Sequence, residues 1–255
     1  MSNISYSGIK TIFLYEIKDF FKEFQFNVIA PLINTLLFVF ILSTIENYYN
    51  INTQGNSYIN FLVPGIVMMV IIQTSFNHLS EVIISMKQIG SFDDYLKSPI
   101  RRSEIFIAFI SSSIFVCIAV GLINLLSLFY FTNFEEINYF SLFYYLTLTI
   151  ITFSSLGALT GFLAYTWDIQ STVSNFFIVP ISFFSGTFFP INSLNEKWQF
   201  IFKYNPFYYF VHGFRSAFID DINLSLFNEI YILIIVSIFF LAAIYIFQKG
   251  YKVIS

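Results

Sequence analysis

The stretch SGTFFPINSLNEKWQFIFKYNPFYYFVHGFR, from Ser185 to Arg215, decides how this chain can fold. It follows an apolar run, Val173 to Phe184, which is too short to cross a bilayer comfortably, because about 20 residues at about 1.5 Å each are needed to span about 30 Å. Pro190 and then Asn205-Pro206 interrupt a helix, while Phe and Tyr residues keep the segment amphipathic. Backbone of this kind is tolerated at membrane depth only where protein or a water-filled cavity satisfies it. The stretch therefore predicts a re-entrant hairpin, over 186–221, that caps a pathway.

The composition places the rest of the chain in a membrane. The 255 residues are 57% hydrophobic, 22% aromatic and only 11% charged, and their mean hydropathy is +0.74. Long apolar runs, rather than segments of alternating polarity, favour helices over a β-barrel. The single cysteine, Cys117, lies inside such a run and is interpreted as a small core residue. No cleavable signal is evident in the first 26 residues.

We therefore predict an all-α membrane protein that forms one transmembrane domain over 1–255. An amphipathic helix over 7–25 is expected to lie in the membrane surface, because apolar residues recur at three- and four-residue spacing opposite Lys, Asp and Glu. Six membrane spans are predicted: 28–45, 58–85, 105–131, 139–165, 171–189 and 228–248. In the fourth span, Gly157, Ala158 and Gly161 form a small-residue face that suits close helix packing.

A polar stripe interrupts the second span. Gln73, Asn77 and Glu81 are four residues apart and share one helix face. Such a face should turn toward protein or water, so these residues are candidates for lining a pathway, although Glu81 near the interface can also be explained as a carboxylate wetted by cytosol. His78 is interpreted as a hydrogen-bonded packing residue rather than a metal ligand, because no second His, Cys or acidic cluster accompanies it.

The most charged stretch is KQIGSFDDYLKSPIRRSE, from Lys87 to Glu104. Gly90 precedes a capping-box pattern, Ser91 with Asp94 three residues later, which predicts a short helix that ends before Pro99. A short rigid helix outside the membrane suits a docking role, whereas a solvated turn with ordinary positive-inside arginines is the alternative for 87–103.

The distribution of basic residues predicts the orientation. With six spans, both termini and the 87–103 loop share one side, which carries nine Lys and Arg residues against about three in the hairpin. The positive-inside rule then places both termini in the cytoplasm and the hairpin outside.

Several chemistries are absent from the sequence. No G-x-x-x-x-G-K-[ST] phosphate loop, H-E-x-x-H or G-x-S-x-G pattern occurs, and the two histidines, His78 and His212, fall on opposite sides in this topology. The chain is therefore interpreted as a transport subunit rather than an enzyme, with its driving force supplied elsewhere. A membrane lipid-processing enzyme or a scaffold remains the alternative.

Three stretches carry a family resemblance: FLVPGIVMM at Phe61 to Met69, GSFDDYLKSPI at Gly90 to Ile100, and SGTFFP through NPFYY and GFR at Ser185 to Arg215. With the six-span order, the chain resembles the permease subunit of ABC type-2 exporters, such as nodulation-factor, antibiotic-efflux and polysaccharide-export permeases. Family members often carry a proline near Asn195 to Trp198, where this chain has Asn195-Glu196-Lys197.

The resemblance implies roles for particular residues. The 90–99 segment would be a coupling helix seated in a groove of a separate ATPase, and 186–215 would form the outer re-entrant motif. The residues implied in ATPase coupling are Gly90, Phe92, Asp93, Asp94, Leu96, Pro99, Arg101 and Arg102. Those implied in the outer motif are Gly186, Phe189, Pro190, Trp198, Asn205, Pro206 and Arg215.

The resemblance also implies partners. Two ATPase subunits, carrying ATP and Mg²⁺ that this chain does not hold, would pair with two permease copies in the bacterial cytoplasmic membrane, among lipid and without nucleic acid. Spans one, two and five would line the route between the copies, and closure of the ATPase dimer would draw the two coupling helices together. A drug, a lipid and a lipid-linked saccharide all fit as the substrate.

Overall fold

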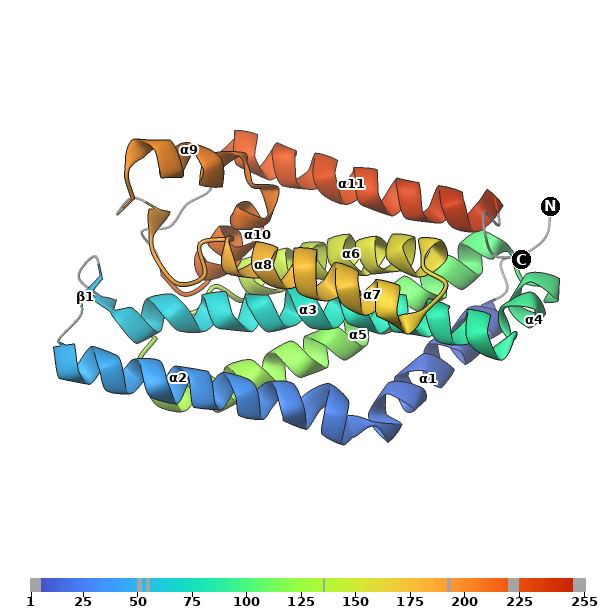
Figure 1. Ribbon diagram of the computed structural model, residues 1–255, viewed down its shortest axis with the longest axis horizontal. Coiled ribbons are helices and arrows are strands. Elements are labelled where there is room, and N and C mark those ends of the chain that lie inside the picture. Colours follow the sequence, from blue (N-terminus) through green and yellow to red (C-terminus); the bar gives the residue numbers. More distant parts are fainter. Residues whose placement is uncertain are drawn as a thin grey trace.

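The computed structural model describes residues 6–49, 52–53, 56–134, 136–191, 194–219 and 225–249. These residues form a bundle of helices that run along a common long axis (Figure 1). The β-structure of the described residues is one short hairpin, in which β1 (Asn52–Thr53) pairs with β2 (Asn56–Ser57). The prediction of an all-α fold is confirmed.

Within the described part, five helices are long and apolar enough to cross a membrane. They are α2 (Ala30–Tyr49), which continues the π-helix η1 (Gln25–Ile29), α3 (Tyr58–Ile89), α5 (Arg102–Leu128), α6 (Tyr139–Leu163) and α11 (Leu226–Lys249). A short 3-10 helix, η2 (Phe129–Phe131), extends α5. These helices match five of the six predicted spans in length and apolar character.

The predicted span over 171–189 has a different form. It consists of α7 (Trp167–Val173), the π-helix η3 (Ser174–Ile178) and α8 (Val179–Phe183) in direct succession. Together they cover 167–183, about 25 Å at 1.5 Å per residue, which is less than a hydrocarbon core of about 30 Å. The helical part thus begins earlier than predicted and ends at Phe183 rather than at residue 189. Its status as a sixth span remains a prediction.

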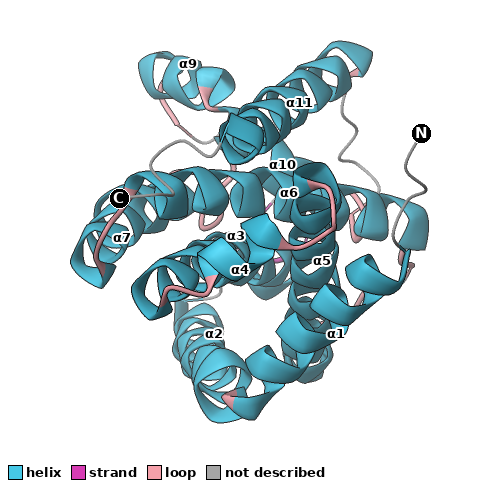
Figure 2. Ribbon diagram, turned by 90° about the vertical axis from the view of Figure 1, so that its right-hand side faces the viewer, coloured by secondary structure: helices cyan, strands magenta, loops and turns pink. Residues whose placement is uncertain are grey.

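Three short helices mark the two ends of the bundle (Figure 1). At one end, α4 (Phe92–Lys97) packs through Phe92 on Phe247, in the last turns of α11; we call this the α4 end, and α1 (Tyr6–Lys22) extends from it on the other side of the bundle (Figure 2). At the other, the hairpin end, α9 (Glu196–Tyr204) and α10 (Pro206–Arg215) follow one another. This grouping matches the predicted separation of the coupling segment from the hairpin.

The core is built around α3. In the most apolar 18-residue stretch of α3, 78% of the stretch is buried, against 17% in the corresponding stretch of the helix formed by η1 and α2. Helix α2 lies at the periphery of the bundle (Figure 2). A Cβ added at Gly157 would lie 2.2 Å from the Phe76 carbonyl oxygen, and one at Gly161 would lie 2.9 Å from the Ile83 Cβ. The predicted small-residue face of α6 therefore does allow close packing, and its partner is α3.

Few polar contacts hold α2 in place. The Thr35 hydroxyl donates to the Asn124 side chain of α5 over 2.8 Å, a bond that is buried between the two helices. At the end of α2, the Glu46 carboxylate accepts from the backbone N–H groups of Tyr58 (2.7 Å) and Ile59 (3.2 Å). It therefore caps the otherwise unpaired N–H groups that begin α3.

Candidate functional site

At the hairpin end, Arg215 joins three separate parts of the chain. Its side chain is 2% exposed; its Nε donates to the Phe61 carbonyl at 3.0 Å, and Nη2 donates to the carbonyls of Gly186 (3.0 Å) and Thr187 (3.2 Å). The guanidinium carbon also lies 3.7 Å from the centroid of the Phe61 ring. Arg215 thus links the start of α3 with the turn after α8 and the end of α10.

Glycines permit this junction. A Cβ on Gly65 would lie 2.8 Å from both the Thr187 carbonyl oxygen and the Arg215 guanidinium. Gly186 has a φ of 72°, in the left-handed region that favours glycine. FLVPG, SGTFF and GFR are therefore separate in sequence but adjacent in the fold.

The turn between α9 and α10 falls at Asn205-Pro206, where the sequence predicts a break, and the Asn205 side chain caps α10. The Asn205 side chain accepts from the Phe207 N–H (3.0 Å) and donates to the Phe184 carbonyl (3.0 Å). Pro206 occupies the first turn of α10, where a missing N–H costs little. Of the other predicted hairpin residues, Phe189 packs edge-on against Phe202 and Trp198 is 55% exposed.

At the α4 end, the predicted short helix is present but its cap is different. Gly90 has a φ of 78° and ends α3. The Ser91 side chain makes no capping bond, because Ser91 itself has helical dihedrals; instead its carbonyl oxygen accepts from the Asp94 N–H at 3.1 Å. The predicted capping box is therefore wrong, and the left-handed glycine is what turns the chain into α4.

Phe92 corrects another expectation. It was expected to sit in a groove of a partner, yet it is 3% exposed and packs edge-on against Phe162 and Phe247 of this chain. Its aromatic ring anchors α4 to α6 and α11, because burying it inside the bundle is more favourable than leaving it in water. Phe92 cannot enter a partner without leaving this core.

The remaining residues of the predicted coupling site have varied surroundings. Asp94, Pro99 and Arg101 are exposed, and Asp93 forms a 3.9 Å ion pair with Lys97. Arg102 donates to the Gln248 carbonyl at the end of α11 over 2.7 Å. The surface that α4 offers to a partner is therefore charged and includes Asp93, Asp94 and the exposed Lys97.

The polar stripe of α3 has two kinds of contact. Gln73 donates to Ser182 of α8 (3.2 Å), whereas the Asn77 oxygen accepts from Gln170 (3.1 Å) and Ser174 (3.0 Å). These bonds hold α3 against the 167–183 segment. Their role in lining a pathway stays a prediction.

A cavity of about 530 Å³ opens beside the C-terminal part of this stripe. Both Asn77 and Glu81 line it, while Gln73 is not among its lining residues. Its other walls come from α1, η1, the beginning of α2 and α4, with Trp167 of α7 at one side. The acidic residues in its lining are Glu16, Asp19, Glu23 and Glu81.

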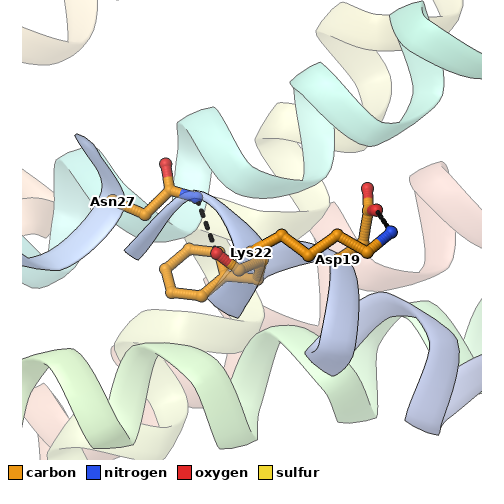
Figure 3. A network of polar contacts seen from close by, with 4 residues as sticks. Asp19, Lys22 and Asn27 are labelled. Carbon is orange, nitrogen blue, oxygen red and sulfur yellow. Dashed lines mark hydrogen bonds and ion pairs between the residues drawn. The ribbon is translucent and has the colours of Figure 1, made fainter. Parts of the chain in front are cut away.

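Lys22 and Asn27 make local polar contacts in the part of the cavity wall that α1 and η1 form. Lys22 pairs with Asp19 at 2.8 Å, and the Asn27 side chain donates to the Phe20 carbonyl at 3.0 Å (Figure 3). The Phe20 ring in turn packs edge-on against His78, with centroids 5.3 Å apart. The contact of Phe20 with His78 joins the bend between α1 and α2 to the C-terminal half of α3.

Two buried groups line this cavity: Glu16, which the sequence reasoning missed, and His78, which it interpreted as a hydrogen-bonded packing residue. Glu16 is 3% exposed and His78 is 7% exposed, and neither Glu16 Oε1 nor His78 Nε2 has a hydrogen-bond partner among the described residues. His78 does pack, as predicted, but that nitrogen is not hydrogen-bonded. In the sequence, the signal for Glu16 is its position midway between Ile12 and Phe20, on the buried face of α1.

Burial raises the pKa of Glu16 to about 7, and the nearby Asp19 carboxylate adds to the shift. The folded protein holds this proton more tightly than the unfolded chain, so the free energy of unfolding falls as pH rises from about 4.5 toward 7. Glu16→Gln is therefore expected to stabilise the protein by about 2 kcal/mol at pH 8 and to change it little at pH 4.5. Thermal unfolding of the purified protein at the two pH values measures this, with the exposed Glu196→Gln as the control. An equal effect at both pH values would contradict the assignment.

Comparison with known proteins identifies the family. The profile of the ABC-2 type transporter family matches residues 7–219. The chain belongs to this family. The inner membrane transport permease YadH of Escherichia coli K12 is 27% identical over 253 residues, which cover 98% of each chain. The YadH permease of Shigella flexneri has the same identity and coverage.

The protein is thus an ABC-2 transport permease of the inner membrane and crosses it several times. As a transport permease it is not itself an enzyme, and the family in general implies an ABC ATPase partner. Within the residues that the structure describes, no three His, Cys, Asp or Glu side chains lie close enough to hold a metal ion.

Proposed function

We propose that this permease is the membrane subunit of an ATP-driven exporter that moves an amphiphilic substrate out of the cytoplasm. The observation that carries the proposal is α4: a short helix with a charged surface, held at one end of the bundle in a chain whose sequence has no phosphate loop. Such a chain needs an energy source, and α4 offers the rigid element on which one could act.

The structure supports α4 as a coupling helix in a specific way. Phe92 locks it to α6 and α11. Lys87, in the last turn of α3 just before α4, donates to the carbonyls of Gly161 (2.8 Å) and Ala164 (3.2 Å) at the end of α6. Because these contacts make α4 continuous with the bundle, a push on α4 would move long helices rather than a loose loop.

The proposed assembly has two permeases and two ATPase subunits, with ATP and Mg²⁺ on the ATPases. The 167–183 segment would complete six spans, so that both termini face the cytoplasm and α9 with α10 form a re-entrant hairpin outside. Spans one, two and five would line the route between the copies. The sparse burial of α2, whose most apolar stretch is 17% buried, supports a partner surface there.

Co-purification tests the ATPase partner. The tagged permease, extracted from its native membrane in mild detergent, should retain a phosphate-loop ATPase that mass spectrometry identifies. Asp93→Ala with Asp94→Ala should reduce the retained ATPase by about tenfold or more, because charged contacts at an interface are lost. The double variant should fold normally, since the Asp93–Lys97 pair is exposed and contributes little stability.

The control for this experiment is Asp168→Ala, which removes an exposed acid of α7 outside α4. Phe92→Ala is unsuitable as a contact variant, because it would dislodge α4 from the core. Absence of any ATPase under conditions that preserve other transporter complexes would overturn the proposal and favour a lipid-processing enzyme or a scaffold.

A further inference from the structure

We propose that the cavity between α1, α3 and α4 binds the protonated amine of a cationic amphiphile, which is the substrate class of the transporter. This inference rests on the proposed function, since it names what that exporter carries. It narrows the three substrate types that the sequence leaves open.

The charge of the lining is of one sign. Four carboxylates line the cavity, and no Lys or Arg is among its lining residues. Lys22 neutralises Asp19 from outside, which leaves Glu16, Glu23 and Glu81 without an ion pair among the described residues. A phosphate or pyrophosphate group would be repelled by this lining, whereas a cation would be attracted.

Two buried groups of the lining lack a partner. Glu16 Oε1 and His78 Nε2 come from different helices, α1 and α3, and each residue is more than nine-tenths buried. A buried polar atom without a hydrogen bond costs about 1–3 kcal/mol, so such atoms commonly have a partner that completes them. A carboxylate oxygen accepts hydrogen bonds, as does His78 Nε2 in the tautomer that carries its proton on Nδ1, and a protonated amine donates up to three. The chemistry of the two orphaned atoms thus matches an amine.

The lining of the cavity does not suit a metal ion, and its size and aromatic walls suit a drug-sized organic cation. Among the described residues no three ligating side chains are close enough for one metal ion, and about 530 Å³ is the volume of a site for a drug-sized molecule. Tyr15, Phe20, Phe26 and Trp167 supply aromatic walls, which attract cations and apolar groups alike. Since Phe26 and Trp167 are also exposed, the apolar part of an amphiphile can extend past them toward lipid.

The two tryptophans make a direct binding test possible. The chain has only two, Trp167 in the cavity lining and Trp198 in α9 at the hairpin end. In the Trp198→Phe protein, Trp167 alone can transfer excitation energy to a dansyl group. We would titrate this protein, in nanodiscs of neutral phosphatidylcholine, with dansylcadaverine, whose primary amine is protonated at neutral pH. Its N-acetylated form has nearly the same shape and no charge, and protein-free nanodiscs correct for partitioning into lipid.

Saturable energy transfer from Trp167 to dansylcadaverine is expected, with at least tenfold weaker binding of the acetylated probe. At pH 8, where the Glu16 carboxyl is mostly ionised, Glu16→Gln should weaken binding of the amine by about tenfold, because it removes the buried charge while it keeps the shape. Glu196→Gln, on the exposed surface of α9, should leave the affinity unchanged. The Trp167→Phe protein, in which only Trp198 remains, should show no saturable transfer.

Equal affinity for the amine and its acetylated form, or an unchanged affinity in Glu16→Gln, would overturn the assignment of the cavity. The outcome is separable from that of the co-purification. If an ATPase is retained but the amine does not bind selectively, the exporter remains and the substrate class is wrong. If the amine binds selectively but no ATPase is found, the cavity is a cation site and the ATP-driven mechanism is wrong.

Discussion

Replacement of Arg215 with alanine should strongly reduce the free energy of unfolding. The substitution deletes three hydrogen bonds from a charged, buried donor and leaves the carbonyls of Phe61, Gly186 and Thr187 to find other partners. Hydrogen bonds from charged groups contribute about 1.5–3 kcal/mol each and are not additive, so we expect a loss of about 3–5 kcal/mol. The apparent Tm should fall by roughly 10 °C or more.

Size-exclusion chromatography of the detergent-solubilised protein, after heating to a series of temperatures, measures this effect. Arg215→Lys keeps the charge but cannot reproduce the fork of donors that reaches both α3 and the turn, so it should rescue only part of the loss. Lys197→Ala removes an exposed positive charge from α9 and should change little. A Tm of Arg215→Ala within a few degrees of the wild type would show that the junction does not depend on this side chain.

The second large effect is expected at Gly157. In Gly157→Ala the new methyl group would lie 2.2 Å from the Phe76 carbonyl oxygen and 3.1 Å from its carbon. Both atoms belong to the backbone of α3, so the two most closely packed helices would have to separate. Overpacking costs about 1–3 kcal/mol or more, while the intrinsic helix preference of alanine over glycine would return about 1 kcal/mol. We expect a net loss of about 2 kcal/mol and a fall in Tm of roughly 4–8 °C, measured as for Arg215.

Gly121 supplies a matched control. It is also a buried helical glycine, but a Cβ there would meet the far end of the Ile71 side chain, at 3.0 Å, which can change its rotamer. Gly121→Ala should therefore be neutral or stabilising. If both alanine variants lost stability equally, helix packing between α3 and α6 would not explain the effect.

The sequence predicts the long helices well because the bilayer thickness fixes how many apolar residues a span needs. It also predicts the turns at Gly90, Gly186 and Asn205, since few residues suit these backbone conformations and caps. The 167–183 segment was harder to delimit, because a π-helical turn between two short helices leaves no distinct signal in the pattern of apolar residues.

Contacts between helices could not be predicted from the sequence alone. Phe92 lies in a helix of only six residues, too short for its periodicity to show which side is buried. The bonds of Gln73 and Asn77 to the 167–183 segment depend on how two helices rotate relative to each other. Glu16 and His78 meet at one cavity only because α1 packs along α5, which brings it beside α3, a tertiary arrangement that spacing along one helix does not encode.

The bend at η1 has a mechanical consequence. From Tyr6 to Tyr49 the backbone is helical apart from a turn at Glu23, so α1 and α2 act as two arms of a bent lever. The hydrogen bond from the Asn27 side chain to the Phe20 carbonyl stabilises the bend, and α2 is the long helix with the least burial. A small tilt of α1 would therefore be magnified along α2 and would spread the far end of the bundle, with little of the core around α3 having to repack.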